Sequence, residues 1–381
     1  MPMHPDQLFR PEQLSVAHIE TGRHLYGGAQ QVVYLLQGLT NRGVSNLLIA
    51  PQNSEISAAV RANGSAKVIT TRHSGDLSLG FYRETRRILS AEQPDLVHIH
   101  SRRGADTLGG LAARTCKVPA VLSRRVDNRE HPLAIRFKYP LYRQVIGISQ
   151  AICHVLGDQG IDQKRLHCVH STVDSGNFDT SANNRQRARQ ALNDKYGIPA
   201  DHLLLAVVAQ LIPRKGHRQL LSVLPAIVAR QPKISLLIFG QGPESEAIAA
   251  QVDSLGLTQQ VQLAGFKPDL DHDLMGIDII VHPAEKEGLG VALLKASAAG
   301  VPIIAGRAGG IPEIVQHEKN GLLFTPGDNV QLQAALELLI DTPLQRQAMG
   351  AAGIQIAQNQ FSIETMVDGN LAVYQHALAQ K

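Results

Sequence analysis

Cations and glycine-flanked backbone amides in the second half of the chain suit the binding of a diphosphate. Arg214 and Lys215 follow an apolar run in the segment AQLIPRKGH, and positive side chains bind phosphate oxygens well. A second apolar run ends at His282 and leads through a turn into a helical stretch, whose first backbone N–H groups form an anion site. The residues of that turn are Gly288, Leu289, Gly290 and Val291. A solvated charge pair on a turn is the alternative for the two cations.

Glu287 lies directly before this turn, where its negative charge would repel a phosphate. A carboxylate in that position is better explained as an acceptor for the hydroxyls of a sugar attached to the phosphates. The alternative is an acid that stabilises the start of a helix through the helix dipole. Together with Lys215, Glu287 indicates a ligand that combines phosphate and sugar.

Two further glycine-rich loops follow apolar runs. In FGQGPE, Gly240 and Gly242 come before Pro243, which is typical of a first helical turn. In TGRHLYGGAQQ, Gly27 and Gly28 open a helical stretch, but the spacing differs from the dinucleotide fingerprint G-x-G-x-x-G. No acid ends the next apolar run to hold an adenosine ribose, so a nicotinamide enzyme is disfavoured.

Positive charge is concentrated in the first half of the chain. Between Arg72 and Arg143 there are fourteen Lys and Arg against seven Asp and Glu. Four of these arginines follow two successive apolar runs, and they are Arg102, Arg103, Arg124 and Arg125. We expect them at the mouth of a site for an anionic ligand, because guanidinium groups match carboxylate and phosphate. The alternative is that they pair with Asp106, Asp127 and Glu130 at the surface.

The composition of the 381 residues indicates two globular domains with aliphatic cores, since hydrophobic residues make up 44% and aromatics only 4%, with no Trp. Three cysteines, an odd number, fit reduced thiols in the cytoplasm. The longest strongly apolar stretch, 203–213, is too short to cross a bilayer, and the first dozen residues do not form a signal peptide. Nucleic acid is disfavoured as a partner because we expect no exposed aromatics for stacking in the basic segment, which also contains no recognisable nucleic-acid-binding module.

Short apolar runs alternate with segments of helical period, which predicts an α/β fold with two doubly wound parallel sheets. In the first half the expected strands are 15–19, 47–50, 67–70, 96–100, 120–123, 145–148 and 166–169. In the second half they are 203–209, 235–240, 261–264, 277–282, 302–305 and 321–324. The carboxyl ends of both sets of strands are expected to face a shared cleft, where ligands of such sheets bind.

The domain boundaries follow from where this alternation stops. We predict an acceptor-binding domain over 1–180, a polar interdomain linker over 181–200 and a nucleotide-binding domain over 201–360. The amphipathic segment 361–381 is expected to be a terminal helix that packs back toward the first domain.

The order of the motifs LIPRKGH, FGQGPE, HPAEKEGLGVALL, ASAAGVPIIA, RAGGIPEIV and NGLLFTPGD resembles the retaining GT-B glycosyltransferases of family 4. The resemblance implies a GT-B fold and a nucleotide-sugar donor. It implies that Lys215 and the amides of 288–291 hold the diphosphate, and that Glu287 touches the donor sugar as the first Glu of an E-x7-E motif. Gly27 and Gly28 would approach the diphosphate from the other domain. The remaining implied donor contacts are Gln210, Arg214, Gly240, Gly242, Gly265, Phe266 and Lys295.

Three positions depart from the family pattern. The second Glu of the motif, which in the family binds ribose hydroxyls, is replaced by Lys295, and a cation cannot accept those hydrogen bonds. An Arg common in the family is Gln210, so Arg214 would supply its charge. The usual first-domain His is Arg125, which we expect to be catalytic together with Glu287 and Lys215.

The resemblance therefore predicts a retaining transfer from a nucleotide sugar, with UDP expected as the nucleotide and no metal required. The basic segment suggests an anionic glycan or glycolipid acceptor, such as the inner core of a lipopolysaccharide, and peripheral binding to the inner leaflet. The Asp-x-Asp in PDLDHD precedes a short amphipathic stretch, so acids at the start of a helix explain it better than a metal site. The histidines that could be metal ligands or bases are His98, His100, His170 and His282, but they lack the paired His–Glu or Cys spacing of a zinc site. The alternatives are an inactive nucleotide-sugar-binding protein, a GT-B epimerase or a phosphorylase.

Overall fold

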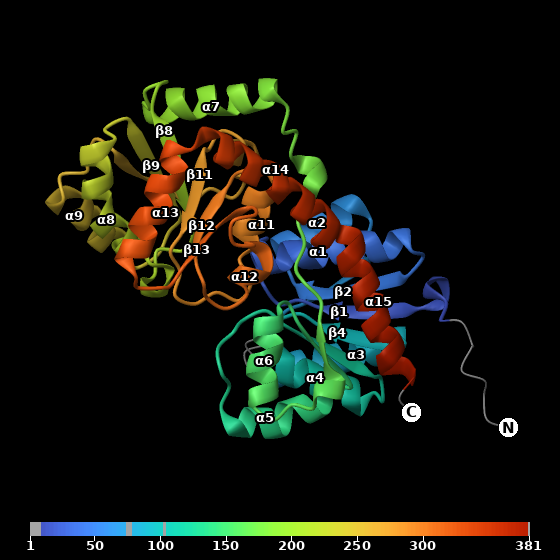
Figure 1. Ribbon diagram of the computed structural model, residues 1–381. Coiled ribbons are helices and arrows are strands. Elements are labelled where there is room, and N and C mark those ends of the chain that lie inside the picture. The colour runs from blue at the N-terminus through green and yellow to red at the C-terminus, as the bar shows by residue number, and fades with distance from the viewer. Residues whose placement is uncertain (1–8, 74–77, 102–103, 380–381) are drawn as a thin grey trace. The chain divides into compact units, whose positions relative to one another are not determined.

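The chain forms two compact units in a computed structural model that describes residues 9–73, 78–101 and 104–379. Unit 1 consists of Met1–Thr172 and Ile363–Lys381, and unit 2 consists of Val173–Ser362. Each unit contains one parallel sheet flanked by helices (Figure 1).

The sheet of unit 1 has seven strands in the order β3-β2-β1-β4-β5-β6-β7. The strands are β1 (Ser15–Ile19), β2 (Ser45–Pro51), β3 (Lys67–Thr71), β4 (Leu96–Ile99), β5 (Ala120–Arg124), β6 (Gln144–Gly147) and β7 (Leu166–Cys168). The helices are α1 (Gly27–Asn41), α2 (Glu55–Asn63), α3 (Leu79–Glu92), α4 (Ala105–Thr115), α5 (Pro132–Lys138), α6 (Gln150–Asp158) and α15 (Ile363–Ala379). Central strands such as β1 and β4 are buried along nearly their whole length because helices cover both faces of a parallel sheet.

The sheet of unit 2 has six strands in the order β10-β9-β8-β11-β12-β13. They are β8 (Leu203–Val208), β9 (Ile234–Phe239), β10 (Val261–Gly265), β11 (Ile279–His282), β12 (Ile303–Gly306) and β13 (Gly321–Phe324). The helices are α7 (Ala182–Tyr196), α8 (His217–Arg230), α9 (Ser245–Ser254), α10 (Asp271–Leu274), α11 (Val291–Ala298), α12 (Ile311–Ile314), α13 (Asn329–Asp341) and α14 (Pro343–Gln360). The two doubly wound sheets predicted from the sequence are confirmed.

The segment 181–200 is not a linker, because most of it forms helix α7 of unit 2. The Ser181 side chain caps the helix by accepting a hydrogen bond from the Asn184 N–H. Its buried apolar side chains are Ala188 and Leu192, and most of the other residues of the helix are polar. Such a narrow apolar stripe explains why the sequence pattern failed to show a helix.

The terminal helix α15 packs on α1 within unit 1, as the sequence predicts (Figure 1). A Cβ atom at Gly38 of α1 would lie 2.3 Å from a methyl group of Val367, so the two helices approach closely there. Tyr374 of α15 is fully buried in the same core as Val16 and Leu35. None of the helices over the described ranges is both long and apolar enough to cross a membrane.

A row of buried histidines lies on β1 and at the end of β4. His18 and His98 are opposite each other in the strand register, and His18 Nδ1 lies 3.0 Å from His100 Nε2. His98 is hydrogen-bonded to the Tyr374 hydroxyl at 2.7 Å and to the Ser123 hydroxyl at 2.8 Å. Burial lowers the pKa of His18 to about 3 and holds the pKa values of His98 and His100 well below the usual range. The three rings are therefore neutral at pH 7.

Acid is expected to destabilise unit 1 through these histidines. Because each has a lower pKa in the folded state than in the unfolded state, unfolding takes up protons once the pH falls below about 6.5. The stability is fully present above that pH and is lost progressively toward the folded pKa, about 3 for His18. We expect the thermal midpoint to fall more steeply between about pH 7 and pH 5 in the parent than in His18→Gln. The matched variant of the exposed His154, His154→Gln, should keep the parent's slope, and equal slopes in all three proteins would contradict this account.

Candidate functional site

The strand order of unit 2 reverses between β8 and β11, and the loops after these strands carry the predicted phosphate site. In open parallel sheets, ligands bind beside the carboxyl ends of the strands at this reversal. The loop after β8 contains Lys215, and the loop after β11 contains Glu287, which are 72 positions apart in the sequence. The topology thus brings the predicted cation and carboxylate together.

Glu287 is the centre of a buried polar cluster. Its Oε2 accepts hydrogen bonds from Lys215 Nζ and, at 3.0 Å, from His282 Nε2. Its Oε1 accepts one from the Gly288 N–H at 3.2 Å. The side chain of Lys215 is 8% exposed and that of Glu287 is 15% exposed. These contacts fix the carboxylate in one orientation.

The protonation states in this cluster follow from its contacts. Burial alone would raise the pKa of Glu287, but the hydrogen bond from His282 and the charge of Lys215 lower it to about 2, so Glu287 is ionised. Burial lowers the pKa of His282 despite the nearby carboxylate, so the imidazole is neutral at pH 7. Since a carboxylate only accepts, we assign the His282 proton to Nε2. This leaves His282 Nδ1 as a buried acceptor with no partner in the described part of the chain.

His217, the first residue of α8, adds a second neutral imidazole beside this cluster. Burial, with smaller contributions from His282 and Lys215, lowers the pKa of His217 to about 4. Its Nε2 is buried and has no hydrogen-bond partner among the described residues. No sequence motif predicts a role for His217, and His282 was considered from the sequence as a metal ligand or a base. The signal in the sequence was their position, since His217 is two residues after Lys215 and His282 is five residues before Glu287.

Two glycines allow the loops around Glu287 to pack tightly. Gly216 has a φ of +73°, and a Cβ there would lie 2.0 Å from the Pro283 carbonyl oxygen. Gly309 has a φ of +51°, and a Cβ there would lie 1.8 Å from the Glu287 carbonyl oxygen. A side chain at either position would push the loops apart.

Helix α11 begins where the sequence predicts its anion-binding turn. Gly290 precedes the helix with a φ of +99°, and no side chain caps the first turn, which begins at Val291. Leu289 is buried under this turn. Backbone N–H groups at such a start favour a negatively charged ligand.

The exposed Arg214 lies beside Lys215 and ties the two loops together. Its Nη1 donates a hydrogen bond to the Lys286 carbonyl at 3.1 Å, and its own carbonyl accepts one from the Glu285 N–H at 3.0 Å. The neighbouring Gln210 is exposed as well. Donor contacts for Arg214 and Gln210 stay predictions.

The segment FGQGPE shapes the next loop of the same sheet edge. A Cβ at Gly242 would lie 2.3 Å from the Leu211 carbonyl oxygen, and the Gly240 N–H donates to the Gly265 carbonyl at 2.9 Å. Pro243 is not in the first helical turn, because α9 begins at Ser245 with Glu244 as its cap residue. Phe266, after β10, is 46% exposed. Roles of Gly240, Gly242, Gly265 and Phe266 in donor binding stay predictions.

Lys295 stands in the position of the family's second Glu, and its ammonium group forms an ion pair with a carboxylate of the same unit. Its Nζ lies 2.6 Å from Asp271 Oδ1, and the two side chains are 28% and 15% exposed. The neighbouring Asp273 pairs with Lys267 Nζ at 2.5 Å. Both acids of the Asp-x-Asp sequence from 271 to 273 are thus held by lysines.

Unit 1 has its own polar cluster at the reversal of its strand order, between β1 and β4. The Glu20 carboxylate accepts hydrogen bonds from the Ser101 hydroxyl and, at 2.7 Å, from the Gly22 N–H. Burial lowers the pKa of the Arg125 guanidinium, and the charge of Glu20 opposes that shift. Arg125 Cδ lies 3.6 Å from where a Cβ at Gly28 would be. Arg125 is therefore placed beside the start of α1, as a cation at pH 7.

Gly27 and Gly28 are the first two residues of α1, and no side chain caps that helix. Their approach to a donor stays a prediction. Glu20 was not predicted from the sequence, because it belongs to no recognisable motif. Arg102 and Arg103 lie outside the described residues.

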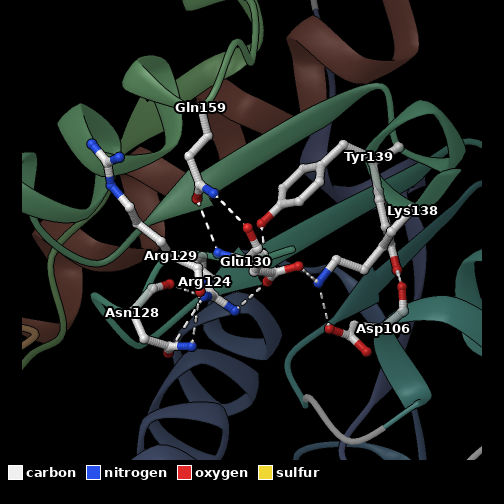
Figure 2. Close-up of polar contacts among 9 residues, drawn as sticks. Asp106, Arg124, Asn128, Arg129, Glu130, Lys138, Tyr139 and Gln159 are labelled. Atoms are coloured by element: carbon white, nitrogen blue, oxygen red, sulfur yellow. Dashed lines mark hydrogen bonds and ion pairs between the residues drawn. The ribbon is translucent and has the colours of Figure 1, made fainter. Parts of the chain in front are cut away.

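Arg124 does not belong to an acceptor site, contrary to the prediction, because it is buried in a network of charges (Figure 2). Its Nη1 lies 2.5 Å from Glu130 Oε1, and Glu130 Oε2 also pairs with Lys138. Lys138 Nζ lies 2.8 Å from Asp106 Oδ2. Two cations and two carboxylates thus neutralise one another and hold the loop that follows β5.

Comparison with known families identifies both units. Residues 26–176 match the family described as "Glycosyltransferase Family 4", and residues 188–356 match "Glycosyl transferases group 1". The chain is built from two glycosyltransferase regions.

Curated relatives match part of these glycosyltransferase regions. The GDP-mannose-dependent alpha-(1-6)-phosphatidylinositol monomannoside mannosyltransferase of Mycolicibacterium smegmatis is 34% identical over 44% of this chain and 46% of its own length. The lipopolysaccharide core biosynthesis glycosyltransferase LpsD of Rhizobium meliloti is 29% identical over 48% of this chain and 52% of its own length. The matched part of the chain spans about half the length of these curated relatives.

Solved structures show the same fold over nearly the whole chain. A glycosyltransferase from Rickettsia africae has a TM-score of 0.85 at 17% identity and covers 97% of this chain and 99% of its own. Anabaena HepE, solved in complex with UDP, has a TM-score of 0.82 at 19% identity and covers 95% of this chain and 100% of its own. At these identities the likeness shows the GT-B fold alone.

Glu130 is expected to be essential for the stability of unit 1. Replacing it in Glu130→Gln leaves Arg124 and Lys138 with one carboxylate between them in a buried site, which should lower the free energy of unfolding by about 3 kcal/mol. The matched variant Glu92→Gln removes an ion pair with Lys67, whose side chain is 63% exposed, and should cost less than about 1 kcal/mol. Urea unfolding followed by circular dichroism measures both. Equal effects of the two variants would contradict the role of the network.

Proposed function

We propose that this protein is a retaining glycosyltransferase that moves a hexose from a nucleoside diphosphate sugar to an anionic glycan or glycolipid. The observation that carries the proposal is the cluster of Lys215, Glu287 and His282 before the uncapped start of α11. The cluster offers a cation and backbone N–H groups for phosphate. For sugar hydroxyls it offers a carboxylate and an imidazole nitrogen that has no partner among the described residues. The matches to two glycosyltransferase families support this assignment.

The chemical demand on unit 2 is to stabilise the leaving diphosphate. When the bond between the anomeric carbon and the phosphate oxygen breaks, that oxygen takes up the electron pair and gains negative charge. Lys215, Arg214 and the N–H groups at the start of α11 are the groups of this unit that can offset that charge. Because these groups already supply positive charge, the proposed reaction does not require a metal ion.

Glu287 and His282 are proposed to orient the donor sugar. The carboxylate accepts hydrogen bonds from sugar hydroxyls, and the lone pair on His282 Nδ1 accepts another. Retention follows if the departing diphosphate takes the proton of the acceptor hydroxyl on the face that it leaves. The new bond then forms on that same face.

The nucleotide of the donor is proposed to be UDP. HepE, a structural neighbour, was solved with UDP, whereas the mannosyltransferase relative depends on GDP-mannose. A panel that contains UDP-, GDP- and ADP-sugars therefore tests the choice directly.

The acceptor is proposed to bind to unit 1 through Arg125. This guanidinium lies at the carboxyl end of β5, and its Nε is buried without a hydrogen-bond partner among the described residues. A phosphate or carboxylate on the acceptor would supply that partner. The LpsD relative is named for lipopolysaccharide core biosynthesis, which supports a glycolipid as the acceptor. We propose that the enzyme works in the cytoplasm, peripherally bound at the inner leaflet.

Loss of Lys215 is expected to abolish most of the transfer. The assay incubates the full chain with the nucleotide-sugar panel and membrane glycolipid, and follows release of the nucleoside diphosphate and labelling of the lipid. Lys215→Ala should lower kcat/KM by about 100-fold to 1000-fold, because it removes the main charge that stabilises the leaving group. Lys319→Ala, which removes an exposed lysine of the same unit, is the control and should stay within about twofold of the parent.

Each rival activity gives a different result in this assay. A changed nucleotide sugar without acceptor would indicate an epimerase, and a need for free phosphate would indicate a phosphorylase. Nucleotide-sugar binding without turnover would indicate an inactive binding protein. The observation that favours this alternative is the ion pair of Lys295, which replaces the family's second Glu, with Asp271. Full activity of Lys215→Ala would overturn the proposed site.

The charge of the acceptor is tested with Arg125. The variant Arg125→Gln should raise KM for a phosphorylated acceptor by about tenfold or more and should leave KM for a neutral analogue of it nearly unchanged. Arg129→Gln, which changes an exposed arginine of the loop after β5, is the control and should leave both KM values near those of the parent. Equal use of the two acceptors by the parent would refute an anionic acceptor.

A further inference from the structure

A cavity of about 590 Å³ lies in unit 2 at the edge of the sheet opposite the Glu287 cluster. Its wall includes Leu203, the first residue of β8, and Asp278, which directly precedes β11. The proposed donor site lies at the carboxyl ends of the same two strands. The six residues of β8 separate the two places by roughly 20 Å, at about 3.3 Å per residue.

The cavity is lined by basic side chains from three parts of unit 2. Arg185 and Arg189 are one turn apart on α7, Lys233 precedes β9, and Arg346 is on α14. Arg189 pairs with Asp278 at 2.7 Å, and Lys233 pairs with Asp201 at 2.8 Å. These two pairs account for both carboxylates that line the cavity.

The other two guanidinium groups have no carboxylate partner among the described residues. Arg185 Nη2 donates to the Ala299 carbonyl at 2.7 Å, and Arg346 Nη1 donates to the Ile340 carbonyl at 2.9 Å. Backbone carbonyls satisfy some of their N–H groups but do not neutralise their charge. In addition, Arg189 Nε is buried without a hydrogen-bond partner in the described part of the chain. The cavity thus keeps uncompensated positive charge and unused N–H donors.

We propose that this cavity binds a phosphate-bearing anion with at least two negative charges, independently of the nucleotide-sugar site. Its volume lies within the range of about 300–1,000 Å³ that is usual for small-molecule sites. Arginine is the side chain best matched to phosphate, because its planar group donates two parallel hydrogen bonds. The ligand is either an inorganic phosphate anion such as pyrophosphate or a nucleotide. Both carry the phosphate groups that the arginines recognise.

The test is calorimetric titration of the full chain with inorganic pyrophosphate at low salt. We expect binding that weakens by at least about tenfold between about 50 mM and 500 mM NaCl, since the attraction is electrostatic and partly exposed. The variant Gln186→Glu places a negative charge on the exposed rim of the cavity and should weaken binding by about tenfold or more. Ala191→Glu makes the same charge change on α7 at an exposed position outside the cavity, so its affinity should stay within about twofold of the parent.

Two further variants separate this cavity from the donor site and from a folding defect. Arg346→Gln should weaken pyrophosphate binding while the variant still binds a nucleotide sugar, which shows that unit 2 is folded. Lys215→Ala should leave binding to the cavity unchanged. If pyrophosphate binding is lost in Lys215→Ala and kept in Gln186→Glu and Arg346→Gln, the anion occupies the donor site and the proposal is overturned.

A parallel titration with adenosine monophosphate distinguishes the two sources of ligand. Tighter binding than pyrophosphate, with the same sensitivity to Gln186→Glu, would support a nucleotide in the cavity. Weaker binding with that sensitivity would support an inorganic phosphate anion. Absence of binding by both compounds at millimolar concentration would refute the proposal.

Discussion

The buried ion pair between Lys215 and Glu287 is the constraint on which the candidate donor site depends. Either charge alone would be costly to bury, so each needs the other in the ligand-free protein. A free phosphate that approaches Lys215 is repelled by the negative charge of Glu287. A sugar phosphate brings hydroxyl donors for the carboxylate together with oxygens for the lysine. The Lys215–Glu287 pair therefore favours ligands that carry both a sugar and a phosphate over ligands that carry phosphate alone.

The same principle explains why two adjacent arginines in unit 1 have different environments. Arg124 is the last residue of β5, and Arg125 is the first residue of the loop that follows, so the two side chains meet different surroundings. Arg124 meets Glu130, and that carboxylate is shared with Lys138 in a closed, neutral network. Arg125 is near Glu20 but has no ion pair among the described residues. Only the second arginine has charge left for a ligand.

The fold could be predicted from the sequence because buried parallel strands have a local signature. Runs such as 203–209 and 277–282 are apolar, and the strands that they form begin and end within two residues of the expected limits. Helix α7 was missed because a helix that covers the rim of a sheet needs few apolar side chains. Its Ser181 cap and its Ala and Arg residues were signals of a helix, but the polarity of the segment was given more weight.

The site could be predicted only in part, because ion-pair partners come from distant segments. The types and positions of Lys215 and Glu287 follow from the motifs, and the strand order at the sheet reversal brings them together. No local pattern indicates that Lys295 meets Asp271. Pairing of an arginine with Glu130 was an alternative at the sequence level, but the burial of the Arg124–Glu130 pair does not follow from helical or strand periodicity. Likewise, His282 and His217 each have one buried ring nitrogen with no hydrogen-bond partner among the described residues. The burial of a single atom cannot be predicted from the sequence.

Helix α11 links the two candidate sites of unit 2 through its two ends. Its first turn presents N–H groups at the Glu287 cluster, and the Ala299 carbonyl at its other end accepts a hydrogen bond from Arg185 of the basic cavity. A cation at the carboxyl end of a helix stabilises the same dipole that attracts an anion to the amino end. The α7 arginine therefore contributes to the position and polarity of the helix whose start is proposed to bind the donor phosphates. This gives the basic helix α7, which the sequence pattern suggested was a connection, a structural reason to belong to the nucleotide-binding unit.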